Sequence, residues 1–173
     1  MPDKSETGAL DDPLSAACEL VGRFLYHFAA VEQRIDAAVA KLFELTDDAA
    51  DILTANIDFS RKINLIETMV HLQASDKAPE WQKSATSLLN AIKGKNDPCR
   101  QIIAHSSFEP AENNSVRFKR TVARGKLQRN EPVWTKTMFD NHFADMDQHA
   151  AQLDRLISDL TPFKIATYFF LGF

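Results

Sequence analysis

Residues 14–45, LSAACELVGRFLYHFAAVEQRIDAAVAKLFEL, decide the fold class of this chain, because their apolar side chains recur at helical spacing. The recurring positions are Leu14, Ala17, Val21, Phe24, Phe28, Val31, Ile35, Ala38 and Leu42. Apolar residues three and four positions apart line one face of an α-helix. The stretch therefore predicts one long amphipathic helix whose apolar face packs against other elements.

The two segments that follow predict further helices with recognisable starts. Residues 46–57, TDDAADILTANI, predict a short helix whose N-cap is Thr46 or the residue after it. Residues 59–73, FSRKINLIETMVHLQ, repeat the apolar spacing, and either Asp58 or Ser60 is able to cap them. The first half of the chain is thus predicted to be helical throughout.

The second half of the chain holds two more predicted helices. One begins at Pro79, a residue that the first helical turn tolerates, and ends at KGKN, residues 93–96. The last long helix begins at a capping-box-like pair, Thr137 and Asp140, and ends at Leu160. Both carry an apolar stripe at helical spacing, which places them in the same bundle.

Residues 106–134 interrupt the helical pattern. A proline, an Asn-Asn pair and a glycine surround VRFKRTV, in which Val116, Phe118 and Val122 alternate with polar residues. This segment is predicted to be a β-hairpin or a long, partly extended loop. The predicted fold is therefore one all-α domain over residues 1–173, a bundle of four to five main helices with this insertion before the last long helix.

The two ends of the chain are predicted to lie outside the bundle helices. Residues 1–12 have neither a basic, apolar secretory pattern nor a membrane anchor, and are expected to be a disordered tail. Residues 161–173 are apolar but too short to cross a bilayer. They are expected to pack onto the bundle or across a dimer, the alternative being a separate partner or a membrane surface. The two cysteines form no disulfide framework, which favours a cytoplasmic protein.

The charge is unevenly distributed. The whole chain carries −4, yet residues 115–136 hold seven basic side chains against Glu131 alone. The candidate RNA-binding residues within this segment are Arg117, Lys119, Arg120, Arg124, Lys126 and Arg129. A basic patch on an acidic body is able to hold a polyanion such as RNA. The alternative is a solvated hairpin whose charges keep its edge soluble and unpaired.

Residues 96–108, NDPCRQIIAHSSF, carry the candidate catalytic pair, Arg100 and His105. Asp97 followed by Pro98 predicts a helix restart, so the pair is expected on a short helix or beyond a kink. Metal-independent RNA cleavage needs a proton acceptor, a proton donor and a cation at the phosphate. Histidine serves either proton role, and arginine binds phosphate oxygens. Positions five apart are offset by about 140° on a helix, so a kink or a second subunit is required.

Other candidate chemistry is weaker. His142, Asp145 and His149 lie near one helical face and could bind a metal, but histidines beside an apolar stripe are more often core-edge residues. Cys99 has no base fixed beside it in the sequence and is interpreted as inert. No metal and no cofactor is therefore expected.

The sequence RQIIAH, from Arg100 to His105, resembles the Arg-x-x-x-x-His motif of the HEPN superfamily, the higher eukaryote and prokaryote nucleotide-binding domains. The long first helix, with GRFLYHFAAVEQRI, and the long last helix fit the same resemblance. Gln101 stands where asparagine is most typical, and Pro98 stands where a continuous helix is common.

The resemblance implies an all-α endoribonuclease of the kind found in toxin–antitoxin, phage-defence and RNA-processing systems. It implies that Arg100 stabilises the phosphate, that His105 handles protons, and that Gln101 and Glu32 support them. It also implies RNA as substrate, a homodimer that brings two motifs together, and an antitoxin or regulatory protein as a further partner. Some members of the superfamily are inactive, so a non-catalytic interaction or RNA-binding module is the second hypothesis.

Overall fold

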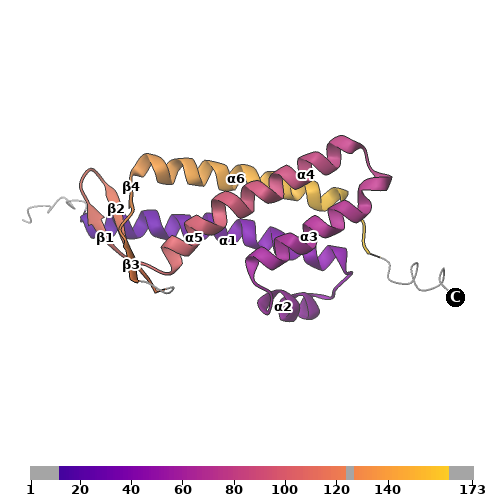
Figure 1. The fold of residues 1–173 in the computed structure, drawn as a ribbon, viewed down its shortest axis with the longest axis horizontal. Coiled ribbons are helices and arrows are strands. Elements are labelled where there is room, and N and C mark those ends of the chain that lie inside the picture. The colour runs from indigo at the N-terminus through magenta and orange to yellow at the C-terminus, as the bar shows by residue number, and fades with distance from the viewer. Residues whose placement is uncertain (1–11, 124–126, 164–173) are drawn as a thin grey trace, which may run out of the picture.

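The computed structural model describes residues 12–123 and 127–163, and within them the backbone alone for residues 122, 123, 127 and 128. These residues are mostly helical, with a small antiparallel sheet (Figure 1). The helices are α1 (Pro13–Leu42), α2 (Asp47–Ala55), α3 (Phe59–Gln73), α4 (Pro79–Ala91), α5 (Asp97–Ala104) and α6 (Lys136–Asp159). A 3-10 turn, η1 (Ala74–Asp76), follows α3, and a π-helical turn, η2 (Ile92–Asn96), joins α4 to α5. The strands are β1 (Ser107–Ala111), β2 (Ser115–Ala123), β3 (Leu127–Asn130) and β4 (Val133–Trp134).

Helix α1 confirms the predicted long helix, and its apolar face is buried from Ala17 to Leu42, whereas Leu14 is 50% exposed. The helix begins where the sequence provides both a cap and a proline. The Asp12 carboxylate accepts a hydrogen bond from the Leu14 amide at 3.2 Å. Pro13 has no amide hydrogen, so it leaves no unpaired donor in the first helical turn. Of the predicted N-terminal tail, residues 1–11 lie outside the described residues.

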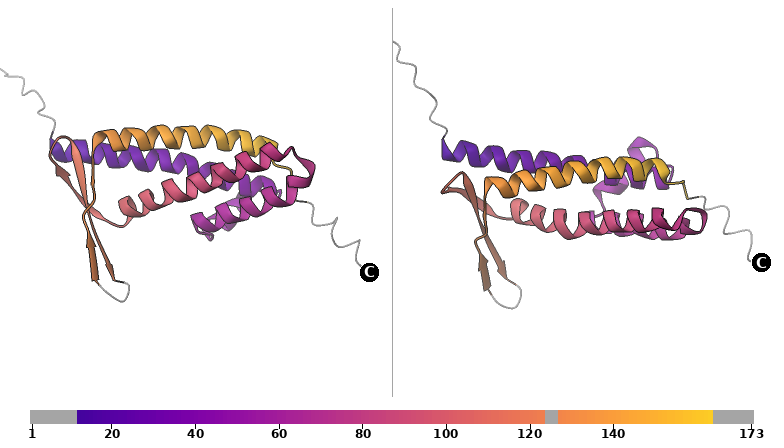
Figure 2. Two further views of the ribbon diagram at one scale, coloured as in Figure 1. Left: turned by 45° about the horizontal axis from the view of Figure 1, so that its top comes forward. Right: turned by 90° about the horizontal axis from the view of Figure 1, so that it is seen from above.

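Helices α1 and α6 pack side by side and run in the same direction. The His27 Nδ1 donates to Asp147 at 2.7 Å, and the Arg34 Nε donates to Asp154 at 2.9 Å. Each partner stands 120 positions further along the chain, so the register is constant, as expected for a parallel pair. The α4–α5 rod runs antiparallel to both helices, and α3 lies beside α1 and α4 (Figures 1 and 2).

Helix α4 ends at Ala91, close to the predicted end at residues 93–96, and Arg100 lies on the predicted short helix, α5, but the chain does not leave the helical conformation between the two helices. The backbone stays helical through Asn96 and Asp97, whose ψ angles are −43° and −46°. Pro98 has no amide hydrogen and would clash with the carbonyl four residues earlier in a regular helix. The wider π-turn immediately before it relieves that conflict without ending the helix. Asp97 is consequently inside the helix and does not cap it.

The predicted start of the last helix is also displaced. The N-cap of α6 is Thr135, whose Oγ1 accepts a hydrogen bond from the Met138 amide at 3.2 Å, and Thr137 lies inside the helix. Strand β4 ends at Trp134, which leaves the next residue extended and positioned to cap. At the other end, the helix ends at Asp159, one residue before the predicted end at Leu160.

The described residues between 107 and 134 form a sheet that is larger than the predicted hairpin. Strand β2 pairs antiparallel with β1 along residues 115–119, with β4 at residues 116 and 117, and with β3 along residues 120–123. Asn113 and Asn114 turn the chain between β1 and β2 with positive φ angles of 58° and 54°, which asparagine tolerates well. The sheet lies at the end of the bundle where α1 and α6 begin (Figure 2).

An aromatic cluster joins the sheet to the helices. Phe118 of β2 and Trp134 of β4 are buried, and their ring centroids lie 5.2 Å apart. Trp134 also lies 5.9 Å from Phe24 of α1 and 5.4 Å from Phe139 of α6. The sheet therefore shares the hydrophobic core of the bundle.

The first residues of the apolar C-terminal segment pack against the ends of other helices. The Phe163 amide donates to the Leu42 carbonyl at 2.7 Å, and the Gln73 side chain bonds both backbone groups of Thr161. Residues 164–173 lie outside the described residues, so the predicted docking of that segment stays a prediction.

Candidate functional site

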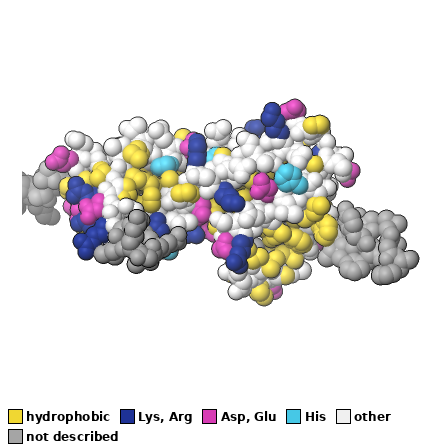
Figure 3. Space-filling view, viewed as in Figure 1, with side chains coloured by type: hydrophobic (Ala, Val, Ile, Leu, Met, Phe, Trp, Pro, Cys, Tyr) yellow, Lys and Arg dark blue, Asp and Glu magenta, His cyan; other side chains and the backbone are white. Residues whose placement is uncertain are grey.

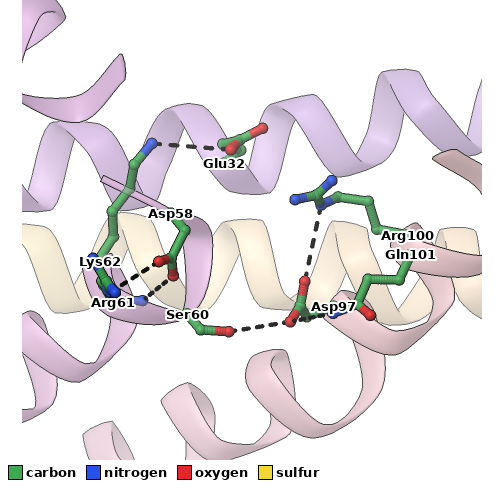
Figure 4. Close-up of polar contacts among 8 residues, drawn as sticks. All are labelled: Glu32, Asp58, Ser60, Arg61, Lys62, Asp97, Arg100 and Gln101. Atoms are coloured by element: carbon green, nitrogen blue, oxygen red, sulfur yellow. Dashed lines mark hydrogen bonds and ion pairs between the residues drawn. The ribbon is translucent and has the colours of Figure 1, made fainter. Parts of the chain in front are cut away.

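Arg100 lies on α5 and faces α1. Its guanidinium carbon lies 5.4 Å from the ring centroid of Phe28, and its side chain is 30% exposed. The Nε lies 3.9 Å from an Asp97 carboxylate oxygen, too far for a hydrogen bond, and has no hydrogen-bond partner among the described residues. Arg100 therefore has hydrogen-bonding capacity left for a ligand (Figure 4).

Asp97 links α5 to α3, a role that the sequence did not reveal. Its Oδ2 accepts from the Ser60 Oγ at 3.1 Å and from the Gln101 Nε2 at 3.3 Å (Figure 4). Asp97 is only 9% exposed. Gln101, the predicted supporting residue, is thus connected to Arg100 through this shared carboxylate.

Glu32 and Arg100 line one cavity of about 550 Å³ between α1, α2 and α3. Lys62, which is only 4% exposed, lies 2.6 Å from Asp36 and 3.9 Å from Glu32. Asp51 and Asp58 also line this cavity, which we call the Arg100 cavity. Its carboxylates outnumber its cations, so its charge attracts cations more than phosphates.

His105 lies at the C-terminal end of α5. Its backbone amide donates to the Gln101 carbonyl at 3.2 Å, and its φ of −121° ends the helix. The residue is exposed, and its imidazole forms no hydrogen bond within the described part of the chain. It is not among the residues that line the Arg100 cavity. One chain therefore does not bring Arg100 and His105 into the same cavity.

The basic segment is partly neutralised by a residue that precedes it. Glu109 of β1 lies directly opposite Arg117 in the strand register. Its carboxylate accepts from the Lys119 Nζ at 2.6 Å and from Arg117 at 3.2 Å. These contacts, the Lys119 hydrogen bond first, lower the pKa of Glu109, so the carboxylate is ionised at neutral pH. The Asn-Asn turn was the sequence feature that could have placed Glu109 there.

Two of the predicted RNA-binding residues, Arg120 and Arg129, have no acidic partner within the described ranges that would neutralise their charge. Among residues 12–123 and 127–163, no hydrogen bond or ion pair holds Arg120 or Arg129. Arg124 and Lys126 lie outside the described residues. Lys and Arg side chains gather at the end of the molecule that carries the sheet, with acidic side chains among them (Figure 3).

The cysteine and histidine cluster between α5 and α6 has the properties of a structural cluster. The Cys99 Sγ lies 3.8 Å from the His142 Nε2, and burial followed by the charge of Asp145 raises the pKa of the thiol. Burial lowers the pKa of both His142 and His149. The described residues contain no group of three or more His, Cys, Asp or Glu side chains that could hold a metal ion.

No protein-family model, curated protein or solved structure matches this chain. None of the helices within the described ranges is long and apolar enough to cross a membrane.

Proposed function

We propose that this protein is a homodimeric, metal-independent endoribonuclease of the HEPN type. The observation that supports the proposal best is the exposed, unpaired imidazole of His105 at the end of the helix that also carries Arg100. An imidazole in contact with solvent can exchange protons with a substrate, whereas a buried one that is hydrogen-bonded to the protein cannot.

The proposed reaction is attack of a ribose 2′-oxygen on the adjacent phosphorus. The bond from phosphorus to the 5′-oxygen breaks, which leaves a 2′,3′-cyclic phosphate and a free 5′-hydroxyl. The His105 imidazole accepts the 2′-hydroxyl proton, and a water molecule donates a proton to the leaving oxygen. Arg100 stabilises the charge that develops on the phosphate oxygens.

In this proposal, two copies of the chain are needed to combine Arg100 with His105. The two residues are about 140° apart around the axis of an ideal helix, and only Arg100 lines the cavity. In an isologous dimer, each site would combine Arg100 of one copy with His105 of the other. Glu32 and Gln101 would support Arg100 in that site, because Glu32 shares its cavity and Gln101 binds Asp97 beside it.

The direct test is cleavage of single-stranded RNA by purified protein in EDTA. We expect cyclic phosphate ends, and loss of cutting in His105→Ala. A matched control is His71→Ala, because His71 is also exposed but lies on α3, where it bonds Gln82. Wild-type cleavage by His105→Ala would refute the catalytic role.

A second test addresses the dimer. Neither His105→Ala nor Arg100→Ala alone should cut RNA, but an equal mixture should recover about one quarter of the wild-type rate, because half of the dimers are mixed and each has one intact site. Folding of Arg100→Ala is checked by circular dichroism, with Arg100→Lys as the conservative variant. No recovery on mixing would refute a site shared in this way.

A non-catalytic interaction module is the second candidate function. The acidic lining of the Arg100 cavity favours it, since carboxylates repel a phosphate and Asp97 already lies beside the guanidinium. This function predicts no cleavage by wild type. It also predicts that Arg100→Ala lowers the free energy of unfolding by about 1 kcal/mol or more.

A further inference from the structure

Strand β2 has two halves with different surroundings. Its first half, residues 115–119, pairs with β1 and β4 and buries Val116 and Phe118 against the helices. Its second half pairs, among the residues that the structure describes, with β3 alone, in the register Arg120 opposite Asn130 and Thr121 opposite Arg129. We call residues 120–123 and 127–130 the ribbon. The ribbon extends away from the helices (Figure 2).

The cations of the two halves differ in availability. Arg117 and Lys119, in the half that packs on the bundle, share the Glu109 carboxylate. A phosphate would have to compete with that carboxylate for both side chains, and each contact it gained would cost an ion pair. Arg120 and Arg129, in the ribbon, have no such competitor within the described ranges.

The register places the two ribbon arginines on opposite faces. Side chains of residues directly opposite each other in an antiparallel pair share a face, and successive residues alternate. Arg129 therefore shares a face with Thr121, while Arg120 shares the other face with Asn130. The ribbon thus presents one guanidinium on each side and can contact phosphates on either side of it.

The ribbon begins next to the candidate catalytic histidine. Ser107, at the start of β1, lies opposite Lys119 in the register, and His105 is only two residues before Ser107. Arg120 directly follows Lys119. A polyanion bound along the ribbon would therefore pass close to His105.

We propose that the ribbon binds the RNA backbone through Arg120 and Arg129, and that Glu109 restrains the RNA affinity of the protein by occupying Arg117 and Lys119. This inference rests on the proposed function, because it takes RNA to be the polyanion. Phosphate contacts of this kind are independent of sequence and weaken with salt, by a slope of about 0.7 in log affinity per contact on a single strand.

The experiment measures the binding of labelled single-stranded RNA by fluorescence anisotropy between about 50 and 200 mM salt. Every protein carries His105→Ala, so that the RNA stays intact. Arg120→Gln with Arg129→Gln should weaken binding and reduce the salt slope by about 1.4, the value for two lost contacts. Arg117→Gln with Lys119→Gln should reduce the slope by less than half as much. Both double variants remove the same net charge.

Glu109→Gln is the decisive single variant. It frees two cations, so RNA affinity and the salt slope should both rise. The matched control is Asp140→Asn, which frees Lys136 from an exposed ion pair on α6 and raises the net charge equally. An unchanged affinity in Glu109→Gln, an equal gain in the control, or equal losses in the two double variants would each overturn the inference. So would the absence of RNA binding by every one of these proteins, including the one that carries His105→Ala alone.

These outcomes are distinct from those of the cleavage assay. RNA that binds through the ribbon but is not cut by wild-type protein would refute the catalytic proposal and leave the ribbon assignment standing. If wild-type protein cuts RNA but Arg120 and Arg129 contribute nothing to RNA binding, the ribbon assignment is refuted and the catalytic proposal stands.

Discussion

The buried pair His149 and Asn96 should hold the π-turn in place, and its loss should be measurable. The two residues are 7% and 4% exposed, and the His149 Nδ1 lies 2.9 Å from the Asn96 Oδ1. Because that oxygen only accepts, the Nδ1 must donate. His149→Ala leaves the buried Asn96 Oδ1 without a hydrogen-bond donor and removes a packed ring. It should therefore lower the free energy of unfolding by about 2–3 kcal/mol.

A double-mutant cycle separates the hydrogen bond from the packing. Urea unfolding followed by circular dichroism gives the free energies of wild type, Asn96→Ala, His149→Ala and the double variant. The coupling energy should be about 1 kcal/mol, the usual net value of one buried hydrogen bond. A coupling near zero would mean that the pair does not stabilise the turn.

The same pair should make stability depend on pH. Burial, followed by repulsion from Lys95, outweighs the attraction of Asp145 and lowers the pKa of His149 below its ordinary value of 6.5. The unfolded state then binds more protons below that pH, so stability should fall as the pH drops through about 6.5. His149→Gln, which cannot titrate, should lose less stability than wild type between about pH 8 and pH 5. An identical slope for the two proteins would refute this assignment.

Four further substitutions test the packing of the fold. Gly94→Ala and Gly22→Ala should each raise the free energy of unfolding by about 0.5–1 kcal/mol, because a Cβ at either position meets nothing within 4 Å; a lower melting temperature would contradict this. Lys62→Met should lower the free energy of unfolding by about 1–3 kcal/mol in a urea titration, because it leaves the partly exposed Asp36 carboxylate unpaired. An unchanged urea midpoint would show that the ion pair is dispensable. Phe118→Ala should lower the free energy of unfolding by about 3–5 kcal/mol by the same method, because its ring is fully buried between the sheet and the helices. A decrease below about 1 kcal/mol would contradict the role of Phe118 in joining the sheet to the bundle.

The helices could be predicted from the sequence because their apolar spacing is a local property. The stripe from Leu14 to Leu42, the N-cap Asp58 and the proline at the first position of α4, Pro79, specify their elements without long-range information. The continuity of α4 and α5 could not be predicted in this way. Asp97 and Pro98 are restart signals in isolation, and contacts with Ser60 on α3 and with α6 keep the backbone helical instead.

The candidate site was predictable only in part, for a related reason. The family resemblance implies that Glu32 supports Arg100, and the two residues line the same cavity. The basic segment begins at residue 115, so Glu109 lies outside it. Only the strand register shows that this carboxylate lies between two of the predicted RNA-binding cations. Cross-strand neighbours depend on turn geometry, and composition alone does not report them.

The charges around Arg100 bear on how RNA binding and catalysis would be divided. The Arg100 cavity is acidic, so it contributes little to attracting a polyanion from solution. The ribbon, which begins next to His105, would supply that attraction instead. Binding energy from parts of a substrate remote from the reacting phosphate can then offset the cost of placing that phosphate beside Arg100. Ribbon variants should therefore lower kcat as well as raise KM in the cleavage assay, because the reacting phosphate depends on this remote contact.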